Sequence, residues 1–225
     1  NQPSPHLKTQ TLNYYDNQTS FTVQPVKGAL TKVERGLSSP GYIAVQRVSY
    51  DSYGNPVVSL DANNHAITTT YDANDLFPVA TTNALGYTTV VSYHADLPWL
   101  AASVTDPNGA TTHYEYDPFG RLTEIYRPGD DLGGTPLRQF NYGDVTHPDW
   151  SPLLITTWDK VGPGSDTVWS RAFYDGLGRA VQTQRPAEDW SDGPPPTGHD
   201  IVQHQGYSAL GQAITATVPY TVASY

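Results

Sequence analysis

The chain lacks several residue types, and each absence excludes a class of protein. It contains no cysteine, so disulfide bonds and thiolate metal sites are not available to it. It contains no methionine, although ribosomal products begin with methionine. Either processing removed the beginning or these 225 residues are a piece of a longer protein, and we expect the piece. Lysine and arginine number only 12 against 22 acidic residues. The net charge of −10 argues against nucleic acid and anionic membrane surfaces as partners. No apolar run approaches the ~20 residues of a transmembrane helix, so we expect no membrane insertion by this segment.

The residues that are present favour β-structure. Hydrophobic residues make up 37% of the chain, while glycine and proline number 19 each and tyrosine 16. Such a composition suits sheets with one face buried and the other wet. No stretch has a 3.6-residue apolar period longer than two turns, so helix should be scarce.

The stretch 104–128 shows the local pattern most clearly. Two Asp-Pro-X-Gly turns, at 106–109 and 117–120, flank a short β-branched and aromatic segment at 110–116. In each turn aspartate can accept backbone N–H bonds, proline presets φ, and glycine takes the positive φ at the exit. A second strand is expected at 122–126. A turn, a short strand and another turn are typical of an antiparallel meander.

The same pattern recurs along the chain at steps of 10 to 11 residues. A tyrosine closes every second strand, at Tyr50, Tyr71, Tyr93 and Tyr116, which are 21, 22 and 23 residues apart. A period in the twenties indicates a repeat architecture. We therefore predict an all-β fold, a long antiparallel meander of about fourteen to eighteen strands.

The repeats are not equally regular along the chain. Residues 1–41 are expected to form a lead-in with a degenerate repeat or hairpin, whose strands at 21–26 and 29–33 flank Lys27 and Gly28. Residues 42–225 are expected to form the regular strip, with long loops near 127–139, 143–153 and 186–200.

The motif Tyr-Asp-X-X-Gly-(Arg/Asn) resembles the YD-repeat (Rhs-repeat) family. Good copies begin at Tyr50, Tyr116 and Tyr174, and degenerate copies at Tyr71 and Tyr207. The positions assigned to the structural repeat are Tyr50, Asp51, Gly54, Tyr71, Asp72, Gly86, Asp106, Gly109, Tyr116, Asp117, Gly120, Arg121, Tyr174, Asp175, Gly178, Arg179, Tyr207 and Gly211.

The resemblance implies a fold and a function. In that family, and in the middle regions of bacterial insecticidal-toxin B/C-type and Rhs proteins, the repeats form a curved strip. The strip spirals into a hollow β-shell around the protein's own C-terminal toxin domain. Teneurins use a similar shell for adhesion. The expected function is therefore a structural segment of the shell wall of a large secreted bacterial protein. Its partners would be the remaining shell and the enclosed domain of the same polypeptide. The alternative is an extracellular adhesion, glycan-binding or filament-forming module.

Enzymatic roles are not expected. Rhs and C-type toxin proteins carry a self-cleaving aspartyl site with two Asp-Pro-X-Gly motifs 18 residues apart, whereas here seven residues separate the two motifs. His113, Glu115 and Glu124 could gather for acid–base work, but the wet face of a sheet explains them better. Asp72, Asn74 and Asp75 do not complete a calcium loop, and His199 and His204 lack further ligands, so no metal or cofactor is expected.

Two binding features remain open. Trp150 and Trp190 lie in loops rich in proline and aspartate and are the candidate glycan contacts, whereas Trp158 and Trp169 lie in expected strands and should pack. Edge strands near 213–218 and 21–33 would offer unpaired backbone groups for self-association.

Overall fold

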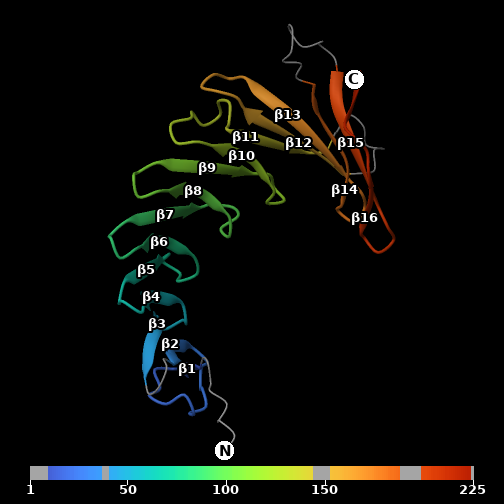
Figure 1. The fold of residues 1–225 in the computed structure, drawn as a ribbon. Helices are drawn as coiled ribbons and strands as arrows, with labels where there is room; N and C mark the ends of the chain where they lie inside the picture. The colour runs from blue at the N-terminus through green and yellow to red at the C-terminus, as the bar shows by residue number, and fades with distance from the viewer. Residues whose placement is uncertain (1–9, 37–40, 144–152, 188–198, 224–225) are drawn as a thin grey trace, which may run out of the picture. The chain divides into compact units, whose positions relative to one another are not determined.

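The computed structural model describes residues 10–36, 41–143, 153–187 and 199–223. Within these ranges the chain forms seventeen strands, all paired antiparallel, and no helix, so the all-β meander is confirmed (Figure 1). No helix suited to crossing a bilayer is found in the described ranges. The chain divides into two compact units, residues 1–110 and 111–225. The boundary expected at residue 41 separates irregular repeats from regular ones and does not mark a compact unit. It stays a prediction.

The first unit is a meander of eight strands in chain order. Each of β1 to β7 pairs with its successor. The strands are β1 (Thr11–Tyr15), β2 (Leu30–Gly36), β3 (Tyr42–Tyr50), β4 (Pro56–Asp61), β5 (Ala66–Tyr71), β6 (Pro78–Thr82), β7 (Thr88–Tyr93) and β8 (Ala101–Thr105).

The N-terminal hairpin differs from the expected one. The prediction of a strand at 21–26 is wrong. Strand β2 pairs with β1 instead, and the residues between these two strands form a long loop. The Asp16 carboxylate organises this loop by accepting the backbone N–H groups of Val26, Lys27, Gly28 and Ala29 at 2.6–3.3 Å. Since β2 also pairs with β3, the edge predicted near 21–33 is not an edge.

The second unit continues the same topology with longer loops. Strands β9 to β15 pair in chain order, and the next two strands both pair with β15. The strands are β9 (Thr111–Tyr116), β10 (Leu122–Tyr126), β11 (Arg138–Tyr142), β12 (Leu153–Lys160), β13 (Thr167–Tyr174), β14 (Ala180–Pro186), β15 (His199–Tyr207), β16 (Ala213–Ala216) and β17 (Tyr220–Ala223). The strand predicted at 213–218 is therefore shorter than expected, and Pro219 precedes the separate β17.

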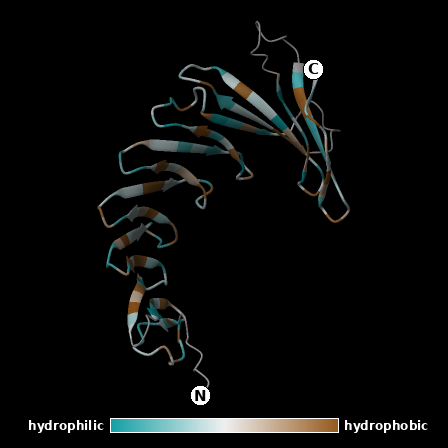
Figure 2. Cartoon of the chain, in the orientation of Figure 1, coloured by the Kyte–Doolittle hydropathy of each residue, from teal (hydrophilic) through white to brown (hydrophobic). Residues whose placement is uncertain are grey.

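Burial is sparse throughout. No residue between 41 and 110 is buried, so this part of the first unit is a single layer of sheet. Figure 2 shows the hydrophobic residues as separate bands within strands rather than as one continuous core. In the second unit the buried strand residues share one face, because cross-strand partners point the same way. They are Tyr126, Leu154, Thr156, Asp200 and Val202.

The hairpins are of two kinds, which alternate along the meander. Hairpins that follow β1, β3, β5, β7, β9, β13 and β15 have a register shift within the first residues of the returning strand. Hairpins that follow β4 and β6 have none. Such a shift is a β-bulge, which bends the strand and disrupts its ladder locally. Since a meander turns at alternate ends of its strands, these seven bulges lie at the same end of the strands within each unit. The pattern has two exceptions, because the β2–β3 pair has a further register shift between Val33 and Glu34 and the β11–β12 pair has none.

Candidate functional site

The candidate site is the repeated turn at the bulged end of the strands. We call these turns the tyrosine-side turns: residues 51–55, 72–77, 117–121, 175–179 and 208–212, each of which follows a strand that ends in tyrosine. The turns at the other end, residues 61–65, 83–87 and 106–110, are the opposite-side turns. They follow strands that end in Asp61, Thr82 and Thr105.

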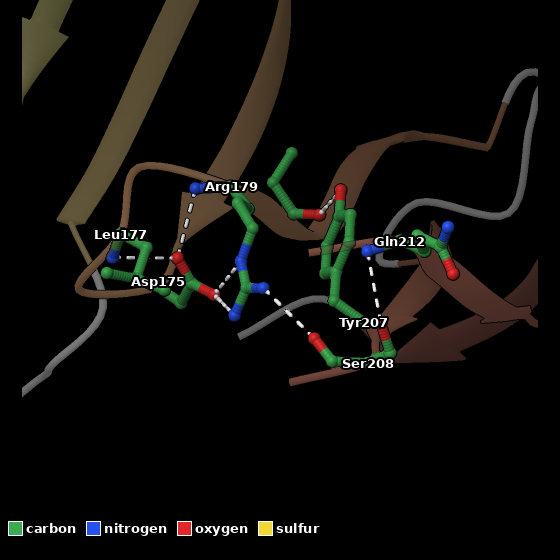
Figure 3. A network of polar contacts seen from close by, with 7 residues as sticks. Asp175, Leu177, Arg179, Tyr207, Ser208 and Gln212 are labelled. Carbon is green, nitrogen blue, oxygen red and sulfur yellow. Dashed lines mark hydrogen bonds and ion pairs between the residues drawn. The ribbon is translucent and has the colours of Figure 1, made fainter. Parts of the chain in front are cut away.

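The turn at 175–179 shows the local chemistry (Figure 3). Asp175 Oδ1 accepts the backbone N–H groups of Leu177 at 2.9 Å and Arg179 at 3.0 Å. The Gly178 N–H closes the turn on the Asp175 carbonyl at 2.9 Å, and Gly178 has φ +75°. This is a three-residue hairpin loop with its last residue in the left-handed region, where glycine is favoured.

Both sides use this same turn. Asp51, Asp61, Asn83, Asp106 and Asp117 each accept two backbone N–H groups through Oδ1. The exit position holds glycine in most turns, and Asn64 (φ 65°) or Asp75 (φ 56°) in the others. Asparagine and aspartate tolerate this conformation better than other side chains. The sequence-based assignment of the Asp and Gly positions therefore describes the local turn.

The tyrosines that end these strands carry a second interaction. Five of their hydroxyls each donate to a backbone carbonyl at the start of the strand that follows the preceding turn on the same side. Tyr93 donates to the Pro78 carbonyl at 2.8 Å, and Tyr142 donates to the Leu122 carbonyl at 2.8 Å. The same bond joins Tyr50 to Leu30, Tyr71 to Pro56 and Tyr207 to Ala180. Each acceptor residue adjoins a bulge, where the ladder is interrupted. The tyrosines thus tie each repeat to the one before it.

The last position of the motif also bridges repeats. The Arg179 guanidinium pairs with Asp175 Oδ2 at 2.6–2.7 Å and lies 4.8 Å from the Tyr207 ring centroid. One of its terminal nitrogens is 3.5 Å from the Ser208 carbonyl of the next turn. Arg121 repeats the arrangement with Asp117 and the Tyr142 ring. Asn55 replaces it in the first unit, where its amide donates to Asp51 Oδ2 and to the Asp75 carbonyl at 2.7 Å.

The electrostatics follow from these bonds. In Asp175 the hydrogen bond from the Arg179 side chain, followed by backbone N–H bonds, lowers the pKa of the carboxyl group. In Asp106 the backbone N–H of Ala110 is the main cause of a lowered pKa. Burial raises the pKa of the Tyr93 and Tyr142 phenols. The site therefore holds ionised aspartates and neutral tyrosines at neutral pH.

The remaining repeat positions lie in these turns or at the ends of the strands that precede them. Tyr116 ends β9, where burial raises its pKa, and Tyr174 ends β13. Gly54, Gly86, Gly109, Gly120 and Gly211 all have φ between 78° and 95°. The candidate glycan contacts Trp150 and Trp190 lie outside the described residues.

The residues weighed as an acid–base site or a calcium loop are brought together only in part. Register places Glu115 opposite Glu124 and His113 opposite Tyr126. Glu124, however, accepts the Tyr126 hydroxyl at 2.6 Å and the Gln139 amide at 2.9 Å. Asp72 is occupied by the N–H groups of Leu76 and Phe77. Among the described residues no group of three or more potential metal ligands converges.

Sequence reasoning missed the tyrosine hydroxyl bonds, the bulges and the bridging role of arginine. The tyrosine spacing was the available signal: a period of two strands implies that alternate hairpins differ. The acceptors could not be identified from the sequence, because they are backbone carbonyls and are independent of side-chain type.

Comparison with known proteins agrees with this geometry. Residues 100–131 match the model of the RHS Repeat family. This part of the chain is therefore similar to Rhs repeats. The fold of the chain matches the crystal structure of TcdB2-TccC3 with a TM-score of 0.74 and 16% sequence identity over 95% of this chain. It also matches the crystal structure of TcdB2-TccC3-Cdc42, with a TM-score of 0.72, 14% identity and 95% of this chain covered.

A further match is the Photorhabdus luminescens Tc holotoxin pore, with a TM-score of 0.54 and 14% identity over 87% of this chain. The chain spans only 15%, 17% and 11% of the lengths of these three chains. At such identities the likeness concerns the fold. No curated protein matches the sequence.

Proposed function

We propose that this Rhs-repeat chain is a structural segment of the wall of a hollow β-shell. The shell belongs to a large secreted bacterial protein and encloses that protein's C-terminal toxin domain. The observation that carries the proposal is the set of tyrosine bonds between successive repeats. They link a sheet that has almost no core of its own.

The physical argument concerns how a single layer of sheet remains ordered. Residues 41–110 contain no buried side chain, so hydrophobic burial contributes little to holding these strands together. Order must come from the ladders, the aspartate turns and the bonds between repeats, each worth only about 0.5–1.5 kcal/mol. Such a structure is an extended surface rather than a compact globule, which suits a wall that separates two spaces.

The test uses the parent polypeptide under limited proteolysis. We expect its C-terminal domain to resist digestion while the wall is intact. The combined variant Tyr93→Phe, Tyr142→Phe and Tyr207→Phe should expose that domain, and Tyr87→Phe, on an opposite-side turn, should not. Digestion of the C-terminal domain at the same rate in wild type and combined variant would contradict an enclosing role.

The proposal assigns the chain no catalytic or metal-binding role. We expect Glu115→Gln to leave the properties of the parent protein unchanged, and dialysed protein to retain no stoichiometric zinc or calcium by elemental analysis. Hydrolysis of polysaccharide that Glu115→Gln abolishes would make the segment an enzyme instead.

Self-association through an edge strand is part of the same proposal. The four residues of β16 are all exposed and carry no charge, and within the described part of the chain they pair with β15 alone. An open strand edge is a template for another chain. Ile214→Lys should reduce association measured by light scattering. Thr217→Pro is not a suitable variant, because the Thr217 N–H bonds the His204 carbonyl within the chain. A monomer at all concentrations would show that this edge does not associate.

A further inference from the structure

One end of the strands carries a large apolar side chain that stays exposed in repeat after repeat. Every tyrosine-side turn has one such residue, between 66% and 89% exposed: Tyr53, Leu76, Phe119, Leu177 and Leu210. The loop 94–100, which follows β7 at the same end, adds Trp99. The opposite-side turns 61–65 and 106–110 have no large apolar residue. Single exposed apolar residues are normal on a protein surface, but a recurrence at the same end of successive hairpins indicates an interaction surface.

In the first unit these side chains form a row at regular spacing. Tyr53, Leu76 and Trp99 follow β3, β5 and β7, so successive members are two strands apart. We call these three residues the apolar tips. Adjacent strands lie ~4.8 Å apart, which puts ~10 Å between neighbouring tips. A partner that covers the row must therefore offer apolar surface over ~20 Å.

The other end of the same unit has an apolar hollow. The turns of this unit alternate between the two ends of its strands (Figure 1), and the hollow, of about 800 Å³, is formed by β2 to β5 and two opposite-side turns. Its apolar lining is Val33, Val45, Leu60, Ile67 and Leu85. Leu85 is 76% exposed, so this surface is open to a partner. The first unit thus has projecting apolar residues at one end and an apolar hollow at the other.

Charge decides which ends can meet. The turns and the loop that carry the three apolar tips contain four aspartates and no lysine or arginine. The hollow contains Arg35, and its carboxylate, Asp61, lies 2.9 Å from the His65 ring nitrogen. Two rows of tips brought together would set aspartates against aspartates, whereas tips placed in the hollow bring aspartates toward an arginine. In the second unit Arg121 and Arg179 accompany the exposed turn residues, so those turns lack this acidic character.

A wall one sheet thick needs joints between its strips. Strands of five to six residues make a strip only ~20 Å wide. A small domain is ~30 Å across, so a single strip width does not enclose it. Neighbouring strips must therefore meet along the ends of their strands, where the tips and the hollow lie.

We propose that the apolar tips of one strip pack into the hollow of a second copy of the strip, head to tail. This deepens the wall function and rests on it. Because two different surfaces meet, the contact is heterologous, and it adds copies in an open series rather than closing as a dimer. It is also distinct from edge pairing through β16, which joins strands side by side.

The test follows association of the full chain by sedimentation velocity, in an Ile214→Lys background that removes edge pairing. We expect the average mass to rise with concentration without a plateau at the dimer. Leu76→Asp with Trp99→Asp disables the tips, and Leu85→Asp disables the hollow, and each should weaken association about tenfold or more. Leu132→Asp is the matched control, since Leu132 is 57% exposed and belongs to neither surface.

Mixing the two disabled variants tests the direction of packing. The tip variant keeps its hollow and the hollow variant keeps its tips, so the mixture should form a complex of one copy of each that grows no further. No complex in the mixture, or a plateau at the dimer without the added aspartates, would overturn head-to-tail packing. Binding to phosphatidylcholine vesicles that only the tip variant loses, with association unchanged, would make the tips a lipid contact instead.

The substituted tip and hollow residues are 62–76% exposed, so the variants should keep the fold, which circular dichroism checks. Serine replaces aspartate at the same positions if a charge lowers the melting temperature. Failure of association leaves the proteolysis test of the enclosed domain unaffected, so the two proposals can fail separately.

Discussion

The two ends of the strands use the same turn but differ in how that turn is connected to the rest of the sheet. At an opposite-side turn such as 106–110, the aspartate, its backbone bonds and the exit glycine form a self-sufficient hairpin loop. At the tyrosine-side turn 175–179, the same loop also carries an ion pair, a bulge and contacts to Tyr207 and Ser208. Local turn chemistry is therefore enough to form a hairpin, whereas the ties between repeats lie mainly at one end.

Acid should have the largest effect, because it acts on the turns of both sides together. The pKa is lowered in Asp16, Asp51, Asp61, Asp72, Asp106, Asp117, Asp130 and Asp175, and reaches about 2 in Asp130. A carboxyl group with a lowered folded pKa stabilises the fold above its unfolded pKa of ~3.9, and that stabilisation is lost as pH falls through the folded pKa. The melting temperature should fall steadily from about pH 4 to pH 2 by circular dichroism.

The Asn83 turn provides the control for this acid effect. It forms the same bonds without a charge, so Asp61→Asn should keep its turn and slightly reduce the acid sensitivity. A melting temperature independent of pH in this range would show that the carboxylates do not hold the turns.

Valine at the exit glycines should be the most costly single change on either side. Gly120→Val and Gly178→Val on the tyrosine side, and Gly109→Val on the opposite side, should each destabilise by about 1–3 kcal/mol in urea unfolding, because a β-branched residue at positive φ is strained. A Cβ added at Gly109 or Gly178 would meet no atom within 4 Å, so backbone strain rather than a steric clash is the cause. Gly176→Ala, at negative φ, should be mild, as should Gly178→Asn. Equal stability of all these variants would refute the turn assignment.

Removing a tyrosine hydroxyl should lower the free energy of unfolding on the tyrosine side and leave it unchanged on the opposite side. Tyr93→Phe and Tyr142→Phe each lose a bond to a backbone carbonyl and should destabilise by about 0.5–1.5 kcal/mol. Tyr87→Phe, on an opposite-side turn and 57% exposed, should have no measurable effect. If the three variants unfold at the same urea concentration, the bonds between repeats contribute nothing to stability.

Neutralising the bridging arginine should have the smallest effect. Arg179→Gln removes the contact with the Tyr207 ring and the ion pair with Asp175, for an expected loss of about 0.5–1 kcal/mol. Arg138→Gln breaks an exposed pair with Asp159, which no described ring covers by a cation–π contact, and should change the free energy of unfolding less. A larger loss of unfolding free energy in Arg138→Gln than in Arg179→Gln would contradict the bridging role of the motif arginine.

The sequence predicted the fold well because its signals are local. An aspartate that opens a turn and a glycine that leaves it specify a hairpin within five residues, and β-branched segments between turns specify strands. The prediction failed at 21–26, where a β-branched segment resembles a strand. Asp16 lies outside that segment, yet its carboxylate gathers the N–H groups of residues 26–29 and holds the chain as a loop.

By itself, the sequence determined the strand order, the turn positions and the two-strand period, because each depends on residues that are neighbours along the chain. Tertiary structure decided which carbonyl each tyrosine contacts, where the bulges lie, and that Gln139, Trp158 and Trp169 share a row. Those features depend on cross-strand register, and a shift of one residue sends every side chain of a strand to the other face. Register is settled only when the hairpins pair, so the contacts that join repeats could not be read from any single repeat.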